Sequence, residues 1–218
     1  MSRRLLSLPV LLGAGLACSD IATPARDEPY EWRLVVDLEV GTDTLSFHWP
    51  REMLPVRVWV EDSLDMPAHV EHGIGIWRDA FLYGEYDAVL VGDSADADVL
   101  VRVLTPPPKA VATAARVLAS FPGCEGATDI DTTTTRFELQ LPVRMYVFPK
   151  FDPASVDLSE CFDITATHEI GHSLGIFRHT SDLTSMMYSD PEASGLNERD
   201  RQTAEVLSHY PPNMVPVR

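Results

Sequence analysis

The sequence predicts an α+β fold in which a mixed sheet packs against three main helices. Apolar residues recur at helical spacing through 67–82, whereas they alternate with polar residues in short segments such as 54–61 and 98–103. The first pattern is typical of an amphipathic helix, and the second is typical of a strand with one buried face. Helices and strands mixed in this way indicate one α+β domain.

Two further helices follow from local signals in the second half of the chain. One is expected to start within 159–163 and to end at about Leu174, just before a glycine. The other is expected over 197–207, where the first residue is an asparagine that can cap it. Glu198 and Asp200 fall in its first turn, where acidic side chains are favourable.

The remaining strand candidates are 31–40, 44–49, 87–92, 114–122 and 136–148. The first two flank a Gly-Thr-Asp turn, so they predict a hairpin. The alanine-rich segment 114–122 is equally compatible with a helix on its residues alone. Pro142 is expected to bend or bulge the last strand. The segment 129–135, which holds four threonines in a row, is expected to be a mobile loop.

Length and charge limit the classes of function. A chain of 218 residues with 45% hydrophobic residues can bury one full core. The formal net charge of −16 argues against nucleic-acid binding and against charge-driven binding to anionic membranes. We therefore expect a monomeric globular domain without a nucleic-acid partner.

Residues 1–17 have the pattern of a secretory signal peptide. Two arginines precede an apolar run that ends at Leu16 and is shorter than a typical membrane span. Cys18 follows directly and is a candidate site of lipidation, as in bacterial lipoproteins, although Gly15 stands where a leucine is usual. Plain secretion is the alternative. Both readings predict an extracytoplasmic protein whose membrane contact is limited to a lipid anchor.

The other two cysteines, Cys124 and Cys161, are a candidate disulfide pair. An exported chain meets an oxidising environment, which favours such a bond. The bridge would tie the start of the helix expected near 159–163 to a neighbouring loop. Two free buried thiols are the alternative, because the sequence does not fix the distance between them.

The residues His168, Glu169 and His172 form an HExxH motif. On a helix the two histidines project from one face and can bind the same ion, while the carboxylate of Glu169 can take a proton from water at that ion. Gly175 can end the helix in a left-handed turn, so that His179 can return as a third ligand. Three imidazoles and one open position are typical of catalytic zinc. A solvated histidine pair is the alternative.

The stretch 168–188 resembles the metzincin zinc peptidases, and within them the matrixins, which include bacterial secreted proteases and matrix metalloproteinases. The resemblance implies that His168, His172 and His179 bind the catalytic zinc, that Glu169 is the general base, and that Met187 forms the Met-turn below the metal. It also implies a twisted, mixed five-stranded sheet, an active-site helix and a C-terminal helix. It covers 50–218, which leaves 1–17 as signal peptide and 18–49 as a tether with an N-terminal hairpin.

The chain departs from the family pattern at one position. The usual spacing, HExxHxxGxxH, would place the third ligand at 178, where Arg178 stays protonated and cannot bind zinc. The histidine arrives one residue later, at His179, so the turn after Gly175 must hold an extra residue. Asp182 is the alternative third ligand.

These observations predict a secreted or lipid-anchored zinc endopeptidase that acts on protein or peptide substrates. The resemblance implies that 114–122 forms an edge strand that holds the substrate in extended form. A zinc-binding envelope lipoprotein without catalytic activity is the alternative, and the extra residue before His179 motivates it. Glu169 argues against it, because a purely structural zinc needs no base. Calcium near 129–135 is a second candidate ion, with a solvated loop as the alternative.

Overall fold

The computed structural model describes residues 28–37, 41–103, 114–121, 123–133 and 137–218. The expected signal peptide, Cys18 and nearly all of the expected tether lie outside these residues. Within the described ranges, no helix is long and apolar enough to cross a membrane.

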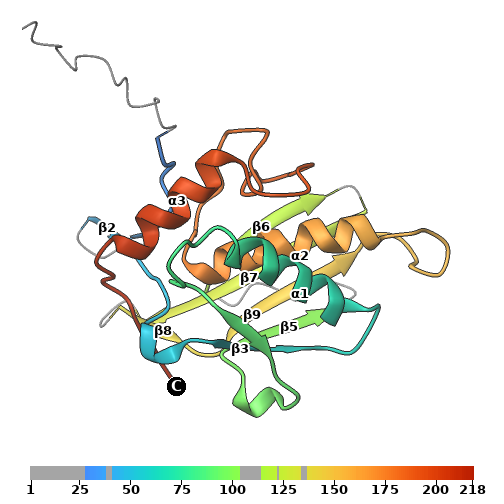
Figure 1. The fold of residues 1–218 in the computed structure, drawn as a ribbon, viewed down its shortest axis with the longest axis horizontal. Helices are drawn as coiled ribbons and strands as arrows, with labels where there is room; N and C mark the ends of the chain where they lie inside the picture. Colours follow the sequence, from blue (N-terminus) through green and yellow to red (C-terminus); the bar gives the residue numbers. More distant parts are fainter. Residues whose placement is uncertain (1–27, 38–40, 104–113, 122, 134–136) are drawn as a thin grey trace, which may run out of the picture.

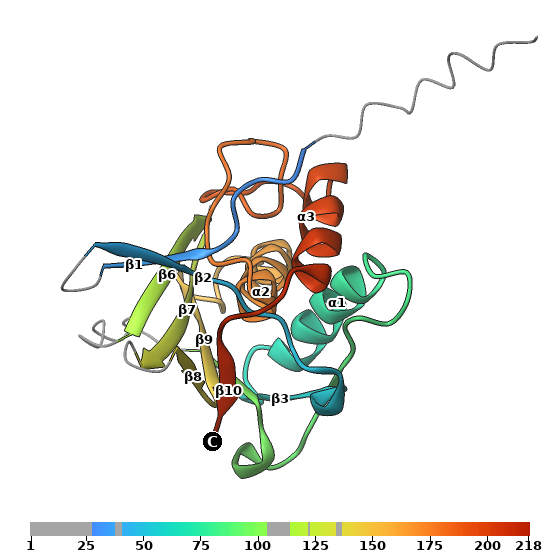
Figure 2. The ribbon, with the colours of Figure 1, turned by 90° about the vertical axis from the view of Figure 1, so that its left-hand side faces the viewer.

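The described residues form an α+β structure with three α-helices and a mixed sheet. Helices α1 (Met66–Arg78) and α2 (Ser159–Leu174) pack side by side (Figure 1). In Figure 2, where α2 is seen nearly end-on, the labelled strands lie to its left and below it, and α1 and α3 (Glu198–His209) lie to its right. The helix that carries the HExxH motif is therefore the central element of the fold.

The main sheet has the strand order β10-β8-β7-β9-β5-β3-β4, and β6 pairs with β7. Strands β4, β3, β5 and β9 run parallel to one another, and β10 runs parallel to β8, whereas β7 is antiparallel to β6, β8 and β9. The strands span β3 (Val56–Val60), β4 (Ala88–Leu90), β5 (Val99–Val103), β6 (Ala114–Phe121), β7 (Cys124–Thr133), β8 (Glu138–Gln140), β9 (Val143–Pro149) and β10 (Val215–Val217).

The alternating segments form strands because one face of each lies on the core. In β3 the valines at 56, 58 and 60 are buried, while the two residues between them are only partly buried. Helix α1 connects β3 to the parallel strand β4, because two neighbouring parallel strands need a crossover connection. Its buried face includes Val70, Ile74 and Trp77, and the Trp77 indole donates a hydrogen bond to the Thr167 carbonyl oxygen at 2.7 Å. This contact fixes α1 against α2 next to the first histidine of the motif.

The expected N-terminal hairpin is present, and it packs on the rest of the protein. Strands β1 (Leu34–Asp37) and β2 (Thr42–Leu45) pair antiparallel. The apolar side chains around them belong to the same hydrophobic core as the helices; they are Tyr30, Trp32, Leu34, Leu45, Phe47 and Trp49. Residues 30–37 and 41–49 thus pack as part of the domain.

The structure corrects three expectations about the sheet. It has eight strands where five were expected, because the short strands β4, β8 and β10 are also paired. The expected loop at 129–135 is wrong through Thr133, since these residues belong to β7. That strand pairs with β6 on one side and with β9 on the other, and such pairing outweighs the low strand propensity of aspartate. The expected long strand 136–148 is divided at Pro142 into β8 and β9.

Cys124 and Cys161 form a disulfide bond. Cys124 begins β7, and Cys161 lies in the first turn of α2. The bond therefore joins the central helix to the strand that runs beside it. The expected disulfide is present, and the alternative of two free buried thiols is not.

Candidate metal centre

Helix α2 ends at Gly175, and this ending turns the chain back toward the histidines. Gly175 has a φ of +115°, and its N–H bonds to the carbonyl oxygens of Gly171 and His172. A side chain at this position would overlap the carbonyl oxygen of Phe47. Glycine is required both by the left-handed conformation and by the close approach of the N-terminal segment.

The turn brings three imidazoles together. The Nε2 atoms of His168 and His172 are 2.9 Å apart, and His179 Nε2 lies 3.1 Å and 3.2 Å from them. Three nitrogens bound to one tetrahedral zinc would be roughly 3.3 Å apart for zinc–nitrogen bonds of about 2.0–2.1 Å. Within the described part of the chain, these residues form the one group of three or more His, Cys, Asp or Glu side chains close enough to share a metal ion.

Hydrogen bonds set the tautomers of the two helical histidines. His168 Nδ1 lies 2.6 Å from the Met186 carbonyl oxygen, and His172 Nδ1 lies 2.5 Å from that of Ile176. A carbonyl only accepts, so both Nδ1 atoms carry the proton and both Nε2 atoms present a lone pair. Burial lowers the pKa of His168 to about 3 and that of His172 well below its usual value. Neutral imidazoles with converging lone pairs are what a cation requires.

The extra residue before the third histidine is accommodated at the surface. Arg178 is exposed, whereas His179 is half-buried beside the other two rings. The turn is held on each side of Arg178, because Phe177 N–H donates to the Trp32 carbonyl oxygen at 2.7 Å and Thr180 N–H donates to that of Met187 at 3.0 Å. Asp182, the alternative ligand, is outside the metal-competent group and instead accepts hydrogen bonds from Thr184.

Glu169 is fully buried and has one oxygen available. Its Oε2 accepts a hydrogen bond from the Thr128 hydroxyl at 2.5 Å, and its Oε1 has no partner among the described residues. Burial raises the pKa of this carboxyl to about 8. A side chain at Gly126 on β7 would overlap Oε1, so the glycine there makes room for the carboxylate. A buried carboxylate with a free oxygen and a raised pKa is suited to proton transfer near neutral pH.

Met187 lies directly against the motif helix. A Cβ at Gly171 would be 2.5 Å from Met187 Sδ and 2.7 Å from a ring carbon of Trp77. The glycine inside the motif therefore allows the methionine and α1 to approach the helix between the two histidines. Gly171 was given no role from the sequence, although an isolated glycine inside a helical pattern often has a packing reason.

Asp200 is a second residue whose role the sequence analysis missed, since it was assigned only to the first turn of α3. Its buried carboxylate accepts hydrogen bonds from Met186 N–H at 2.9 Å, from Asn197 N–H at 3.1 Å and from the Ser185 hydroxyl. Asn197 accepts from the Asp200 N–H in return, which makes a capping box. The cap of α3 thus holds the segment whose carbonyl orients His168.

The comparisons with known proteins return no relative: no family model matches the chain, and no curated protein matches it. The chemistry of the site is therefore inferred from the chain's own residues. Three neutral imidazoles meet, which is a donor set for a divalent metal ion, and Glu169 of the same motif supplies a buried carboxylate with a free oxygen that can move a proton.

Proposed function

We propose that the protein is a zinc-dependent endopeptidase with a metzincin fold, most similar to the matrixins. The observation that carries this proposal is the convergence of three imidazole Nε2 atoms, and the residue that follows His168 is Glu169, whose buried carboxylate has a free Oε1. A structural zinc site is closed by four protein ligands, whereas a catalytic site keeps a position open. The described residues supply three ligands and a base, which favours the catalytic kind.

Features around the histidines support the metzincin reading. The motif helix ends at a glycine, the chain returns with a third histidine, and Met187 packs on the helix at Gly171. Strand β6 pairs with β7 along one side, and among the described strands nothing pairs with its other side. An open edge beside α2 suits an extended peptide, which can bind by adding a strand.

The residues of the chain divide the chemistry between them. His168, His172 and His179 would hold the zinc, which when bound supplies a Lewis acid for the peptide carbonyl and lowers the pKa of water. Glu169 accepts the proton at Oε1, because Thr128 occupies Oε2. It then returns the proton to the leaving amine. Met186 and Ile176 keep the helical imidazoles in the tautomer that the metal needs.

Export of the protein is part of the proposal. It is supported by the signal-peptide pattern of 1–17 and by a disulfide bond, which persists in oxidising compartments. Lipidation at Cys18 would anchor the enzyme to the cell envelope, and plain secretion would release it. Membrane fractionation of cells that express the chain or its Cys18→Ser variant separates the two, since only an anchored protein moves to the soluble fraction on substitution.

The activity is tested by incubating the purified chain with unfolded casein and a peptide library, and by identifying the products by mass spectrometry. We expect cleavage that a chelator abolishes, that zinc restores and that Glu169→Gln removes. Glu160→Gln is the matched control, because it changes a carboxyl on the same helix that is exposed. Bound zinc without any cleavage would instead support the alternative, an envelope protein that binds zinc and partners but catalyses nothing.

A further inference from the structure

The segment before β1 is attached to α3 by hydrogen bonds. Arg199 Nε donates to the Glu28 carbonyl oxygen at 3.1 Å, and Tyr30 N–H donates to the Thr203 hydroxyl at 3.3 Å. The Tyr30 hydroxyl, which is buried, donates to Asp200 Oδ1 at 3.0 Å. Residues 28–30 are thereby fixed at three points along the helix.

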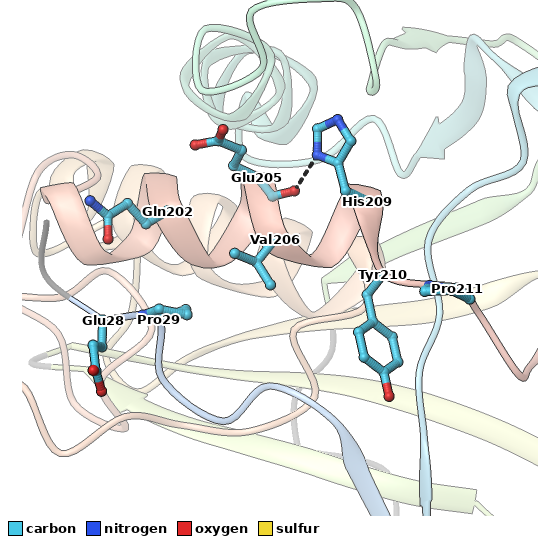
Figure 3. A pocket seen from close by; sticks show the side chains of 8 residues that line it. All are labelled: Glu28, Pro29, Gln202, Glu205, Val206, His209, Tyr210 and Pro211. Carbon is cyan, nitrogen blue, oxygen red and sulfur yellow. Dashed lines mark hydrogen bonds between the residues drawn. The ribbon is translucent and has the colours of Figure 1, made fainter.

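The first two residues of this segment border a groove. A groove of about 700 Å³ remains between Glu28 and Pro29 on one side and Val206 and Tyr210 on the other (Figure 3). Beyond the groove, the Tyr30 side chain reaches the buried carboxylate of Asp200. The ring of Tyr30 is buried in the hydrophobic core, and its hydroxyl adds a specific polar contact with α3.

Asp200 connects that hydroxyl to a metal ligand. Its Oδ1 accepts from Tyr30, and its Oδ2 accepts from Met186 N–H at 2.9 Å. The carbonyl oxygen of the same methionine lies 2.6 Å from His168 Nδ1. Three hydrogen bonds in series thus join Tyr30 to the imidazole of His168, and hydrogen bonds in such a series polarise one another.

The same segment also contacts the turn that carries the third histidine. The Trp32 carbonyl oxygen accepts from Phe177 N–H at 2.7 Å, two residues before His179. Residues 30–32 are therefore connected to the metal centre twice, once through Asp200 on α3 and once through the turn that leads to His179. They precede residue 50, where the matrixin-like part of the chain was expected to begin.

We propose that Tyr30 is a positioning residue for the metal centre, which it serves by fixing Asp200 and, through Met186, the orientation of His168. This inference rests on the metal site proposed above. Burial is the main reason that the pKa of Tyr30 is raised well above its usual value, and the Asp200 carboxylate raises it further. The hydroxyl accordingly stays a donor over the working pH range.

The test is the Tyr30→Phe variant of the full chain, with Tyr86→Phe as the control. Tyr86 is also buried, but its ring packs against Phe81. Zinc affinity is measured by competition with a chelator, and the visible absorption spectrum is recorded with cobalt(II) in place of zinc. Mutation of a residue that hydrogen-bonds to a metal ligand changes metal affinity by about 10–100-fold. Tyr30 is separated from His168 by Asp200 and Met186, so we expect Tyr30→Phe to lose about tenfold in zinc affinity and to change the cobalt spectrum. Tyr86→Phe is expected to change neither.

A double-mutant cycle separates positioning from general stability. If Tyr30 acts through Asp200, the loss of affinity in Tyr30→Phe combined with Asp200→Asn will be smaller than the product of the two single losses. Unchanged affinity and an unchanged spectrum in Tyr30→Phe would overturn the inference, as would a variant that no longer folds without metal. Zinc affinity and the cobalt spectrum are both independent of peptide cleavage. A chain that binds zinc but cleaves nothing would therefore refute the proposed activity, and these two measurements on Tyr30→Phe would still decide this inference.

Discussion

His168 and Met186 are joined by a hydrogen bond of 2.6 Å between the imidazole Nδ1 and the backbone carbonyl oxygen, although eighteen residues separate them. The bond settles the tautomer of the first ligand, and it makes the segment around Met187 part of the metal centre. Because Met186 is held in turn by Asp200, the geometry of the site depends on α3 as well as on α2.

The first prediction concerns the identity of the third ligand. We expect His179→Ala to weaken zinc binding by at least about 100-fold, because it leaves only two of the three imidazoles. Arg178→Ala, at the neighbouring exposed position, is expected to change the affinity by less than about twofold, and Asp182→Asn likewise. Competition with a chromophoric chelator measures all three. A larger effect at Asp182 than at His179 would reverse the assignment.

The second prediction concerns Gly171. A methyl group there would lie 2.5 Å from Met187 Sδ, so Gly171→Ala is expected to lower the free energy of unfolding by about 1–3 kcal/mol through overpacking. Gly75→Ala is the control, since this helical glycine in α1 has nothing within 4 Å of an added Cβ. Alanine there should raise the free energy of unfolding by about 0.5–1 kcal/mol. Urea denaturation of both variants checks the opposite signs.

The third prediction concerns the disulfide bond, which closes a sequence separation of 37 residues. Constraining a loop of this length in the unfolded chain stabilises the folded state by about 3–4 kcal/mol. We expect the Cys124→Ser, Cys161→Ser double variant to lose that amount in denaturant unfolding. A loss below about 1 kcal/mol would show that the bond contributes little in solution.

The fourth prediction is a pH dependence of the metal-free protein. Burial raises the pKa of Glu169 to about 8, so the folded state takes up a proton that the unfolded state releases above about pH 4.5. The stability that this group contributes is present below pH 4.5 and is lost as the pH rises toward 8. Glu169→Gln removes this titration. It should therefore raise the free energy of unfolding of the metal-free protein more at pH 8 than at pH 5. An equal effect at both values would contradict the raised pKa.

Local signals were sufficient for the helices and for the histidines that lie close together. Helical spacing predicted α1, the asparagine at 197 predicted the cap of α3, and Gly175 predicted the end of α2. The HExxH spacing brought His168 and His172 onto one face, and the structure adds His179 to them rather than Asp182.

The features that the sequence did not predict depend on contacts between residues that are distant in the chain. Four of the residues 129–133 carry polar side chains that suit a loop, and pairing with β6, β8 and β9 makes the segment a strand. The contact of Tyr30 with Asp200 joins residues 170 positions apart, and no local pattern reports it. Gly126 on β7 leaves space for the side chain of Glu169 on α2. These residues are distant in the sequence, so no local pattern predicts their contact.

The most direct test of the central claim is the zinc content of the purified chain, measured by inductively coupled plasma mass spectrometry beside the His168→Ala, His172→Ala double variant. We predict about one zinc ion per chain in the parent protein and none in the variant, because the variant keeps only one of the three converging imidazoles. A parent protein without zinc after zinc loading, or a variant that retains the same amount, would contradict the three-histidine metal centre.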